Sequence, residues 1–383
     1  MINRKNWKKL VESAWKRKSV IWLAGVRRVG KTCLTQSLNN VEYFDCELPR
    51  VRQIMEDPQD FWDNFDSPNG KRVILDEIHC LDNPSQLLKI AADHYPAVRV
   101  LATGSSTLGA SGKFRDTLAG RKTNLWLTSM TQADLDDFGK TDLKHRFLHG
   151  GLPPFFLADE LPERDYQEWM DAYWAKDIQE LFRLERRGAF LKFAELLMVQ
   201  SGGMFQAQSF AQPCGVSQPT ITNYLRALEE TFVVHVIRPF HSRRSKEIVS
   251  APKVYAFDTG FVCYYRGWTS LRDKDLGDLW EHFVLNEIFA ATQCRTVNYW
   301  RDKRKHEIDF IWAPRGRAPL AIECKWSVGE FNPGTLRSFR QLHPDGDNVV
   351  VAHDVDRPFK RTCDGMVVHF ENLEGLVRRL TVS

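Results

Sequence analysis

The sequence of 383 residues lacks the patterns that mark membrane, secreted and zinc-binding proteins. Its eight cysteines form no C-x-x-C pair and no Cys/His cluster at zinc spacing, which indicates the reduced thiols of a cytosolic protein. No apolar run approaches the roughly 20 residues of a membrane helix, and the basic N-terminal segment has no apolar signal-peptide core. We therefore expect a cytoplasmic protein with no membrane partner.

An excess of charge of one sign is also missing. The net charge of +4 does not by itself indicate a nucleic-acid partner, so local basic patches must carry that argument. The composition, 43% hydrophobic and 27% charged, excludes a largely disordered chain, and the length predicts two or three domains. The function of this globular chain must therefore be sought in local motifs.

One such motif is a glycine-rich segment of the form G-x-x-x-x-G-K-[ST], from Gly25 to Thr32. It follows an apolar run that predicts a buried strand and precedes a helix start, which is the setting of a phosphate-binding loop. Lys31 is expected to reach the β- and γ-phosphate oxygens, and the Thr32 hydroxyl to bind Mg²⁺. The predicted nucleotide-binding residues of the loop are Gly25, Val29, Gly30, Lys31, Thr32 and Cys33.

An acidic pair ends another apolar segment, residues 72–79, with the sequence RVILDEIH. Asp76 is expected to hold Mg²⁺ directly or through water, and Glu77 to polarise the attacking water as a catalytic residue. Two carboxylates at the end of a buried strand are costly unless they meet a metal or a hydrogen-bond network. The alternative is a solvated acidic turn.

A third predicted strand, residues 98–102, ends in polar residues. ATPases of the additional-strand class keep a γ-phosphate sensor at this strand tip, and Thr103 and Ser105 are the two candidates here. An ordinary helix cap is the alternative. The guanine-specific N-K-x-D element is absent, because DKDL at residues 273–276 lacks the asparagine. We therefore expect ATP rather than GTP.

Strand-like and helix-like segments alternate over residues 1–140, which predicts a parallel sheet flanked by helices. The segment HGGLPPFF, residues 149–156, interrupts regular structure and marks a boundary. Residues 141–208 are predicted to form a helical linker or lid. Its aromatic residues at three- and four-residue steps are interpreted as core: Tyr166, Trp169, Met170, Tyr173 and Trp174.

Residues 209–260 have the outline of a winged helix: two helices around a turn at Cys214-Gly215, then strand, basic loop and strand. One interpretation is DNA contact through the second helix and the loop; the other is a packing module inside an ATPase. The candidate DNA-contacting residues are Thr220, Asn223 and Arg226 on the helix, and Arg243, Arg244 and Lys246 in the loop.

Residues 261–383 carry a second group of charged residues within apolar strands. Asp309 lies in one predicted strand, and Glu323 and Lys325 alternate onto the same face of the next. With Glu281 on the preceding helix, this is the layout of a PD-(D/E)xK nuclease. Glu281, Asp309 and Glu323 are expected to bind Mg²⁺ or Mn²⁺, with Glu323 and Lys325 catalytic and Lys325 activating water. The alternative is a salt bridge between Asp309 and Lys325 in a domain without activity.

In this order the motifs resemble those of bacterial and archaeal AAA-type ATPases that pair an N-terminal P-loop domain with a C-terminal domain of uncharacterised function having a PD-(D/E)xK nuclease-like core. The resemblance covers most of the chain, including VRRVGKT, LDEIH, LATGSST, TLAGRK, FLHGGLPP, PKVYAFDTG, LWEHFVLNEI and IECKWS. It implies that Arg121, with Arg115 as the alternative, contacts the γ-phosphate or a subunit interface. It also admits a homo-oligomer formed through the ATPase domain.

The resulting expectation is an α/β chain. An AAA/ASCE-type P-loop sheet over residues 1–140 precedes the helical and winged-helix regions, and a restriction-endonuclease-like domain occupies residues 261–383. The leading hypothesis is an ATP-dependent, DNA-associated enzyme whose nuclease-like domain binds or cuts DNA. One alternative is a nucleotide-gated interaction protein whose nuclease-like domain is silent. The other is a STAND-like switch that holds ATP and assembles with a protein partner, against which the intact Glu77 argues mildly.

Overall fold

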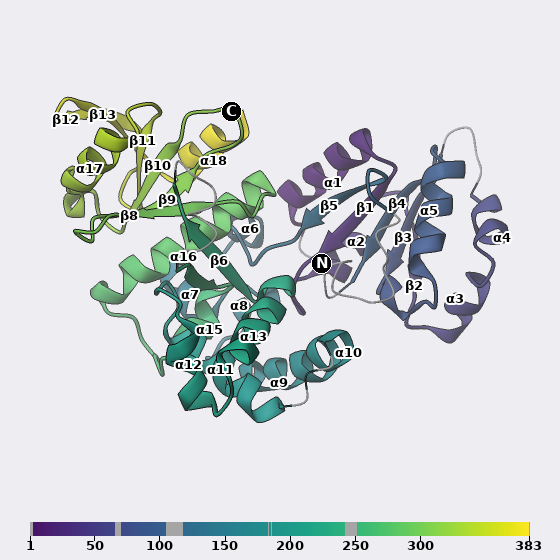
Figure 1. Ribbon diagram of the computed structural model, residues 1–383. Helices are drawn as coiled ribbons and strands as arrows, with labels where there is room; N and C mark the ends of the chain where they lie inside the picture. The colour runs from purple at the N-terminus through teal and green to yellow at the C-terminus, as the bar shows by residue number, and fades with distance from the viewer. Residues whose placement is uncertain are drawn as a thin grey trace.

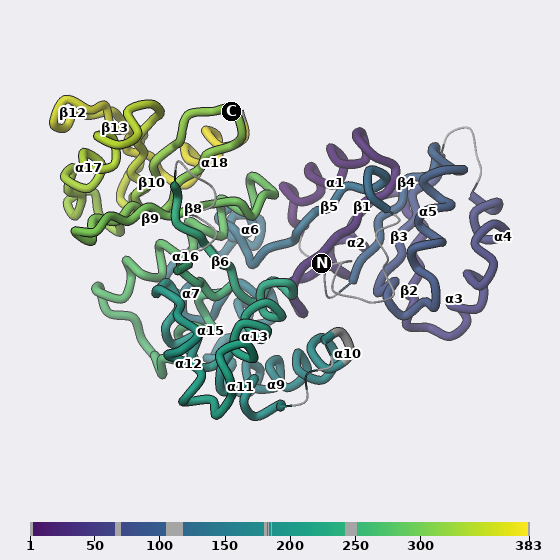
Figure 2. Tube along the Cα trace, viewed as in Figure 1, coloured from purple at the N-terminus to yellow at the C-terminus, as the bar shows by residue number. Residues whose placement is uncertain are grey.

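Two sheets and a helical lobe make up the fold (Figure 1). The computed structural model describes residues 3–65, 70–104, 118–182, 184, 186–241 and 251–382. The chain trace passes from the first sheet through the helical lobe to the C-terminal sheet, and each forms a separate lobe in Figure 2.

The first sheet has five parallel strands in the order β2-β3-β4-β1-β5. Their bounds are β1 (Val20–Ala24), β2 (Glu42–Asp45), β3 (Arg72–Asp76), β4 (Arg99–Thr103) and β5 (Lys122–Trp126). The predicted parallel α/β sheet is confirmed. Because β4 lies between β1 and β3, the strand expected to carry the sensor ends beside the phosphate loop and the acidic pair.

Helices cover both faces of this sheet (Figure 1). Their bounds are α1 (Lys5–Arg17), α2 (Lys31–Gln36), α3 (Pro49–Ile54), α4 (Pro58–Asp63), η1 (Ile78–Cys80), α5 (Pro84–His94) and α6 (Gln132–Phe138). The side chains of Asp57 and Asn83 cap α4 and α5, each followed by a proline at the first helical position. The indole of Trp15 anchors α1 by donating to the carbonyl of Val100 at 3.1 Å.

The helical lobe follows. Its elements are α7 (Leu143–His149), α8 (Pro153–Phe156), α9 (Glu163–Tyr173), η2 (Trp174–Ile178), α10 (Gln179–Phe182), α11 (Arg187–Val199), α12 (Ala207–Cys214), α13 (Gln218–Glu230) and α15 (Thr259–Tyr265). The aromatic stripe on α9 is buried, so its interpretation as core is confirmed. We call residues 163–182, in which η2 is a π-helical turn, the helical arm. No helix within the described ranges is long and apolar enough to cross a bilayer.

The expected winged-helix outline is only partly a separate unit. Gly215 adopts a left-handed φ of 64° between α12 and α13, and Ser217 caps α13. Strands β6 (Val234–Pro239) and β7 (Lys253–Ala256) pair antiparallel, but β6 also pairs parallel with β8 (Asn298–Arg301). The hairpin is therefore one edge of the C-terminal sheet, and no structural break occurs at the expected boundary after residue 260.

The C-terminal sheet has eight strands in the order β12-β13-β11-β10-β9-β8-β6-β7 and mixes parallel and antiparallel pairs. The remaining bounds are α16 (Asp273–Thr292), β9 (Glu307–Trp312), β10 (Leu320–Lys325), η3 (Val328–Glu330), α17 (Gly334–Leu342), β11 (Asn348–Ala352), β12 (Phe359–Cys363), β13 (Met366–Glu371) and α18 (Leu373–Val382). Helix α16 packs against β10 and α18, and α17 against β9.

Helix α16 joins the C-terminal sheet to the first lobe. The carboxylate of Glu287 accepts from the backbone N–H of Gln132 at 2.5 Å, and Asn286 donates to the carbonyl of Ser129 at 3.0 Å. Two turns earlier, the indole of Trp280 donates to the carbonyl of Val351 on β11 at 3.0 Å. One helix therefore fixes the C-terminal sheet relative to the end of β5.

Candidate functional site

The phosphate loop is shaped by two glycines and a buried arginine. Gly30 has a φ of 98° immediately before α2, and a Cβ on Gly25 would lie 2.6 Å from the carbonyl oxygen of Leu127. Between them, Val29 is buried and its carbonyl accepts from the guanidinium of Arg4 at 3.0 Å. The glycines are thus required by backbone geometry, while Val29 contributes packing.

Arg4 is a functional residue that motif analysis misses. Its Nε and Nη2 donate to the Asp134 carboxylate at 2.8 and 2.6 Å, and both side chains are buried. Asp134 also belongs to the capping box that begins α6 with Thr131. Arg4 therefore connects the phosphate loop to α6, the helix that follows β5. Asp134 three residues after Thr131 is the sequence signal for the cap, but nothing local signals Arg4.

Lys31 points into the curve of the loop. Its side chain is 6% exposed, and Nζ donates to the carbonyls of Gly25 at 2.9 Å and Val26 at 3.1 Å. Burial lowers the pKa of Lys31, and neighbouring carboxylates, Glu77 first among them, oppose that shift. The ammonium group therefore lies where a phosphate-binding lysine is needed, held by carbonyls that phosphate oxygens would replace.

Three hydroxyl groups converge on Asp76 at the end of β3. Thr32 and Tyr43 donate to its Oδ2 at 2.8 and 2.5 Å, and Thr103 donates to Oδ1. The contact between Thr32 and Asp76 places two predicted Mg²⁺ ligands side by side. Thr103 occupies the expected sensor position at the tip of β4, whereas Ser105 lies outside the described residues.

Glu77 takes up a left-handed backbone conformation, φ 51°, directly after β3. Its N–H donates to the Thr103 hydroxyl at 3.1 Å, and its carboxylate lies 3.1 Å from Nδ1 of His79. Burial alone would raise the pKa of Glu77, but the His79 hydrogen bond and the charge of Lys31 lower it. Burial disfavours the imidazolium of His79, yet hydrogen bonds with Cys80 and Glu77 raise its pKa to about 10. The glutamate is therefore an oriented carboxylate at neutral pH.

A cavity of about 560 Å³ opens beside the loop. Its lining includes the loop and helix residues Gly30, Lys31, Thr32, Cys33 and Leu34, together with Glu77, Arg4, Arg27 and Arg28. The rest of the lining is apolar and consists of Phe138, Pro153, Pro154 and Leu157. Leu157 is 48% exposed, which is unusual for a large apolar side chain. A lining with a charged part and an apolar part in a cavity of this volume suits a ligand with a polyphosphate and a planar base.

The second charged group lies on β9 and β10. These strands pair antiparallel, so Asp309 comes opposite the E-x-K segment. Asp309 accepts from the backbone N–H of Cys324 at 2.7 Å, and Lys325 Nζ lies 2.9 Å from Glu323 and 3.7 Å from Asp309. The expected neighbourhood of Asp309, Glu323 and Lys325 is therefore present.

Glu281 reaches this region from α16 but has other partners. The Tyr255 hydroxyl donates to it, and Lys253 Nζ lies 3.4 Å from Glu281 and 2.5 Å from Glu307. Sequence analysis misses Lys253, Tyr255 and Glu307. A lysine within the apolar strand segment KVYAF was the available signal, since a buried lysine needs an acidic partner.

Comparison with protein families divides the chain into three consecutive segments. Residues 17–135 match a family model described as an AAA domain. The first lobe is an AAA-type P-loop ATPase domain. Residues 140–272 and 276–372 match models described as domains of unknown function, DUF8612 and DUF4143. The AAA match thus covers the phosphate loop, the acidic pair and the sensor strand, while the other two models assign no activity.

Relatives extend over all three segments. Uncharacterized proteins of Mycobacterium tuberculosis and Mycobacterium bovis are each 27% identical over 358 residues, covering 90% of this chain and 78% of theirs. The Walker-type ATPase of Pyrococcus abyssi is 14% identical, covers 70% of this chain and 96% of that chain, and has a TM-score of 0.45. A DNA polymerase III gamma subunit-related protein of Thermotoga maritima is 10% identical, covers 60% and 99%, and has a TM-score of 0.25. At these TM-scores neither structure bears on function.

Within the AAA-type domain, Arg121 lies far from the phosphate loop, where it was expected to contact the γ-phosphate. Lys122 pairs with Val20, the first residue of β1, so Arg121 lies at the edge of the sheet opposite the phosphate loop. There it makes an ion pair with Asp93 at 2.6 Å. Five residues of strand separate the two edges, about 16 Å, so the predicted contact of Arg121 with the γ-phosphate of its own chain is wrong. Arg115 lies outside the described residues.

Outside the AAA-type domain, several buried carboxylates lie close together and affect one another's pKa. Burial, together with the charges of Asp309 and Glu281, raises the pKa of Glu323. Burial and the charge of Asp309 likewise raise the pKa of Glu281. Burial disfavours the ammonium of Lys325, but Asp309 and Glu323 raise its pKa. Among the residues that the structure describes, Oε1 of Glu323 is buried with no hydrogen-bond partner. The cluster therefore holds more acidic groups than its two lysines neutralise.

The predicted three-carboxylate metal set is not assembled. No group of three or more His, Cys, Asp or Glu side chains in the described ranges is arranged to hold a metal ion. Glu281 turns instead to Lys253 and Tyr255, because a buried carboxylate needs a counter-charge or a donor. Asp309 and Glu323 remain adjacent, and the free Oε1 of Glu323 is the feature that fits a cation.

Proposed function

We propose that the AAA-type domain binds ATP with Mg²⁺ and hydrolyses it. The observation that carries the proposal is the gathering of Thr32, Asp76, Thr103 and Glu77 at one edge of the sheet, beside Lys31. These side chains come from the loop after β1 and from the ends of β3 and β4. Parallel strands bring their carboxyl ends together, which is where ligands bind in open α/β sheets.

Each residue has a distinct role in this proposal. Lys31 exchanges its two loop carbonyls for β- and γ-phosphate oxygens, at no cost in burial. Thr32 and Asp76 hold the metal ion, which offsets phosphate charge when bound. Glu77 orients water for attack on the γ-phosphorus and accepts its proton, and Thr103 contacts the γ-phosphate or that water.

The apolar part of the cavity lining is proposed to receive the adenine base. Pro153, Pro154 and Leu157 come from the segment after β5 that sequence analysis treats only as a boundary. Flat apolar groups favour a planar base, and a guanine-specific element is missing from the sequence. The start of the helical lobe would thus contribute to the nucleotide site.

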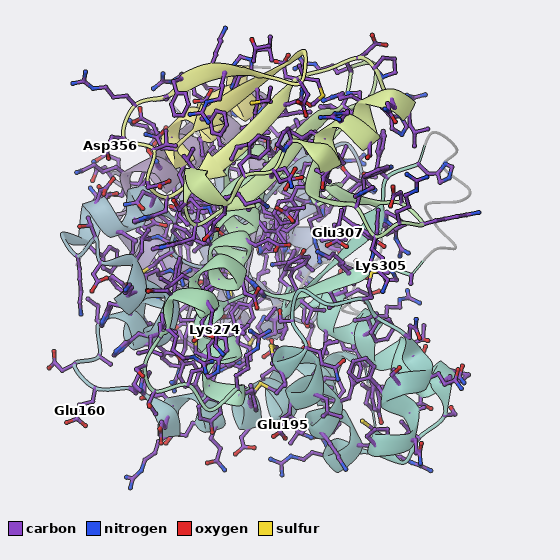
Figure 3. All side chains as sticks on the ribbon, turned by 90° about the vertical axis from the view of Figure 1, so that its left-hand side faces the viewer. Glu160, Glu195, Lys274, Lys305, Glu307 and Asp356 are labelled. Carbon is purple, nitrogen blue, oxygen red and sulfur yellow. The ribbon has the colours of Figure 1, made fainter. Side chains whose placement is uncertain are left out.

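We further propose that the C-terminal domain binds DNA and cuts it with a divalent metal. Asp309 and Glu323 would hold the ion through the free Oε1 of Glu323, and Lys325 would orient water. Lys305, from a run of three basic residues, lies near Glu307 where the C-terminal sheet meets the helical lobe (Figure 3). A basic turn beside the cluster suits phosphate contacts.

The alternative is an interaction protein whose C-terminal domain is silent. It is favoured by the ion pairs of Lys253 with Glu281 and Glu307 and of Lys325 with Glu323, which account for much of the acidic charge. In that case the cluster is structural, and DNA or protein binding would need no metal. Both proposals include a homo-oligomer. In such an oligomer, Arg121 would contact the nucleotide of a neighbouring copy rather than that of its own chain.

One experiment tests both halves. The full-length protein, Lys31→Ala and Lys325→Ala are compared for ATP hydrolysis and for cleavage of supercoiled, linear and single-stranded DNA with Mg²⁺ or Mn²⁺. Lys31→Ala is expected to abolish hydrolysis, and normal turnover in that variant would remove the ATP site. Lys325→Ala is expected to abolish cleavage while hydrolysis continues. Hydrolysis without cleavage under any condition would favour the silent interaction protein.

A further inference from the structure

Three contacts join the helical arm to the phosphate loop. The indole Nε1 of Trp169 donates to the carbonyl oxygen of Arg27 at 3.0 Å, and Arg28 lies 3.2 Å from Asp165. The third contact is an ion pair between Arg27 and Asp177, with 3.6 Å between Nη1 and Oδ2. The arm belongs to the helical lobe in the chain, yet its side chains contact the loop of the AAA-type domain directly.

Asp177 differs from Asp165, the other acidic residue that pairs with an arginine of the phosphate loop, because it is buried. Its side chain is 2% exposed, whereas those of Asp165 and Arg28 are 50% and 40% exposed. A carboxylate removed from water is costly unless cations compensate it. Two cations of the phosphate loop act on Asp177, Arg27 through the ion pair and Lys31 at longer range: burial lowers the pKa of Lys31, and the charge of Asp177 opposes this.

Arg27 and Lys31 also line the nucleotide cavity. The same two cations therefore face Asp177 on one side and the space for a polyphosphate on the other. A cation that turns toward phosphate oxygens loses part of its interaction with Asp177, because its charge is then shared between two anions. Asp177 lies within the π-helical turn η2, and such turns often occur at functional sites.

We propose that Asp177 is a positioning residue that competes with nucleotide phosphates for Arg27 and Lys31, so that a bound triphosphate weakens the docking of the helical arm. The inference rests on the proposed ATP site and extends it to a residue outside the AAA-type domain. Coupling of this kind is reciprocal: bound nucleotide weakens docking of the arm by the same factor by which docking weakens nucleotide binding. The effect grows with phosphate charge, so it is largest for ATP, smaller for ADP and smallest for AMP.

The test uses the full-length protein and Asp177→Asn, which removes the charge and keeps the size. Fluorescent N-methylanthraniloyl derivatives of ATP, ADP and AMP are titrated with Mg²⁺ present. Asp177→Asn is expected to bind the ATP derivative about 5- to 20-fold more tightly, the ADP derivative less so, and the AMP derivative unchanged. Asp165→Asn removes the same charge from the same arm at an exposed pair, and its affinities should stay within about twofold of the wild type.

The outcomes separate this inference from the proposed function. A wild type that binds no ATP removes the ATP site, and the inference falls with it. A wild type that binds ATP, with Asp177→Asn binding it equally or more weakly, leaves the ATP site standing and overturns the inference. Asp177 would then only hold the shape of the phosphate loop.

Hydrogen exchange of the wild type gives a second measurement that needs no variant. Saturating ATP is expected to speed amide exchange in residues 163–178, because the contact with Arg27 weakens. Unchanged or slower exchange there, in protein shown to bind ATP, would overturn the inference even if Asp177→Asn did not fold. Where the variant folds, fast exchange without nucleotide is expected.

Discussion

Two pairs of acidic residues in this protein have different surroundings: Asp76 and Glu77 at the end of β3, and Asp309 and Glu323 within β9 and β10. Asp76 accepts hydrogen bonds from three neutral hydroxyl groups, and His79 and Lys31 lower the pKa of Glu77. Burial and the neighbouring carboxylates raise the pKa of Glu323. At the first pair, hydrogen-bond donors and a cation therefore orient the carboxylates, whereas the second pair lies among more carboxylates than its lysines compensate.

Because of these surroundings, we expect a bound cation to stabilise the two sites to different extents. At the first site, the hydrogen-bond donors to Asp76 and Glu77 are already in place. The binding of a metal ion with its nucleotide would therefore change few of the hydrogen bonds there. At the second site, a divalent ion would relieve repulsion among Glu281, Asp309 and Glu323, which their two lysines leave partly uncompensated. Similar residue types therefore give one site that is preorganised and one that a bound cation would stabilise.

The largest effect is expected from a substitution that inactivates the ATP site alone. Glu77→Gln keeps the shape of the side chain but removes the proton acceptor, so ATP hydrolysis should fall by about 10²- to 10⁴-fold. Binding of ATP should persist, because Lys31, Thr32 and Asp76 are untouched. Phosphate release and nucleotide titration measure the two quantities separately.

The matched control is His79→Gln, which loses the imidazolium beside Glu77 but keeps the carboxylate. It should reduce hydrolysis less than Glu77→Gln and move the acidic limb of the pH–rate profile upward, since the pKa of Glu77 is no longer lowered by His79. An unchanged rate in Glu77→Gln would show that another group accepts the proton.

The second prediction concerns the carboxylates of the C-terminal domain. In the wild type, Mn²⁺ well above its dissociation constant should stabilise the C-terminal domain by about 2–3 kcal/mol, a rise in Tm of several degrees. Glu323→Gln should lose this rise, because it replaces the oxygen that fits the ion. The exposed Glu330→Gln in the same domain serves as control. Equal stabilisation of all three proteins would place the ion elsewhere and favour the silent domain.

The sequence alone predicts the first site well because its parts are local. The motif from Gly25 to Thr32 directly follows β1 (Val20–Ala24), the apolar run expected to be a strand, and ends in the start of α2. Asp76 and Thr103 follow from strand ends that must meet at one edge of a parallel sheet. These inferences need only periodicity and strand order.

What the sequence does not reveal depends on contacts between distant segments. Asp177 reaches Arg27 across 150 residues of chain, and Lys253 meets Glu281 because β7 is an edge of the C-terminal sheet. The misplacement of Arg121 has the same origin. Arg121 directly precedes β5, and β5 is parallel to β1, so Arg121 lies at the edge of the sheet where the strands begin, opposite the phosphate loop.

The third prediction asks whether a raised carboxylate pKa implies a metal site. Glu287 lies six residues after Glu281 on α16, and burial raises its pKa to about 7. Its partner is the backbone N–H of Gln132 rather than another carboxylate of the cluster. We expect it to control stability through pH and to have no response to Mn²⁺.

The sign follows from proton binding. Between pH 4.5 and about 7 the folded protein keeps a proton on Glu287 that the unfolded chain has released, so this residue makes stability fall as pH rises. Glu287→Gln keeps an acceptor for Gln132 and has no charge to bury. Relative to the wild type, it should be stabilised more at pH 8 than at pH 5, by up to about 3 kcal/mol.

Denaturant unfolding at the two pH values measures this difference, and exposed Glu160→Gln (Figure 3) controls for the loss of one charge. A Glu287→Gln variant equally destabilised at both pH values would mean that Glu287 is ionised in the folded state and pairs with Arg146, which lies close enough to act on its pKa. Mn²⁺ should stabilise Glu287→Gln as much as the wild type. Burial would then raise both glutamate pKa values, while only the crowding of Glu323 by other carboxylates creates a demand for a cation.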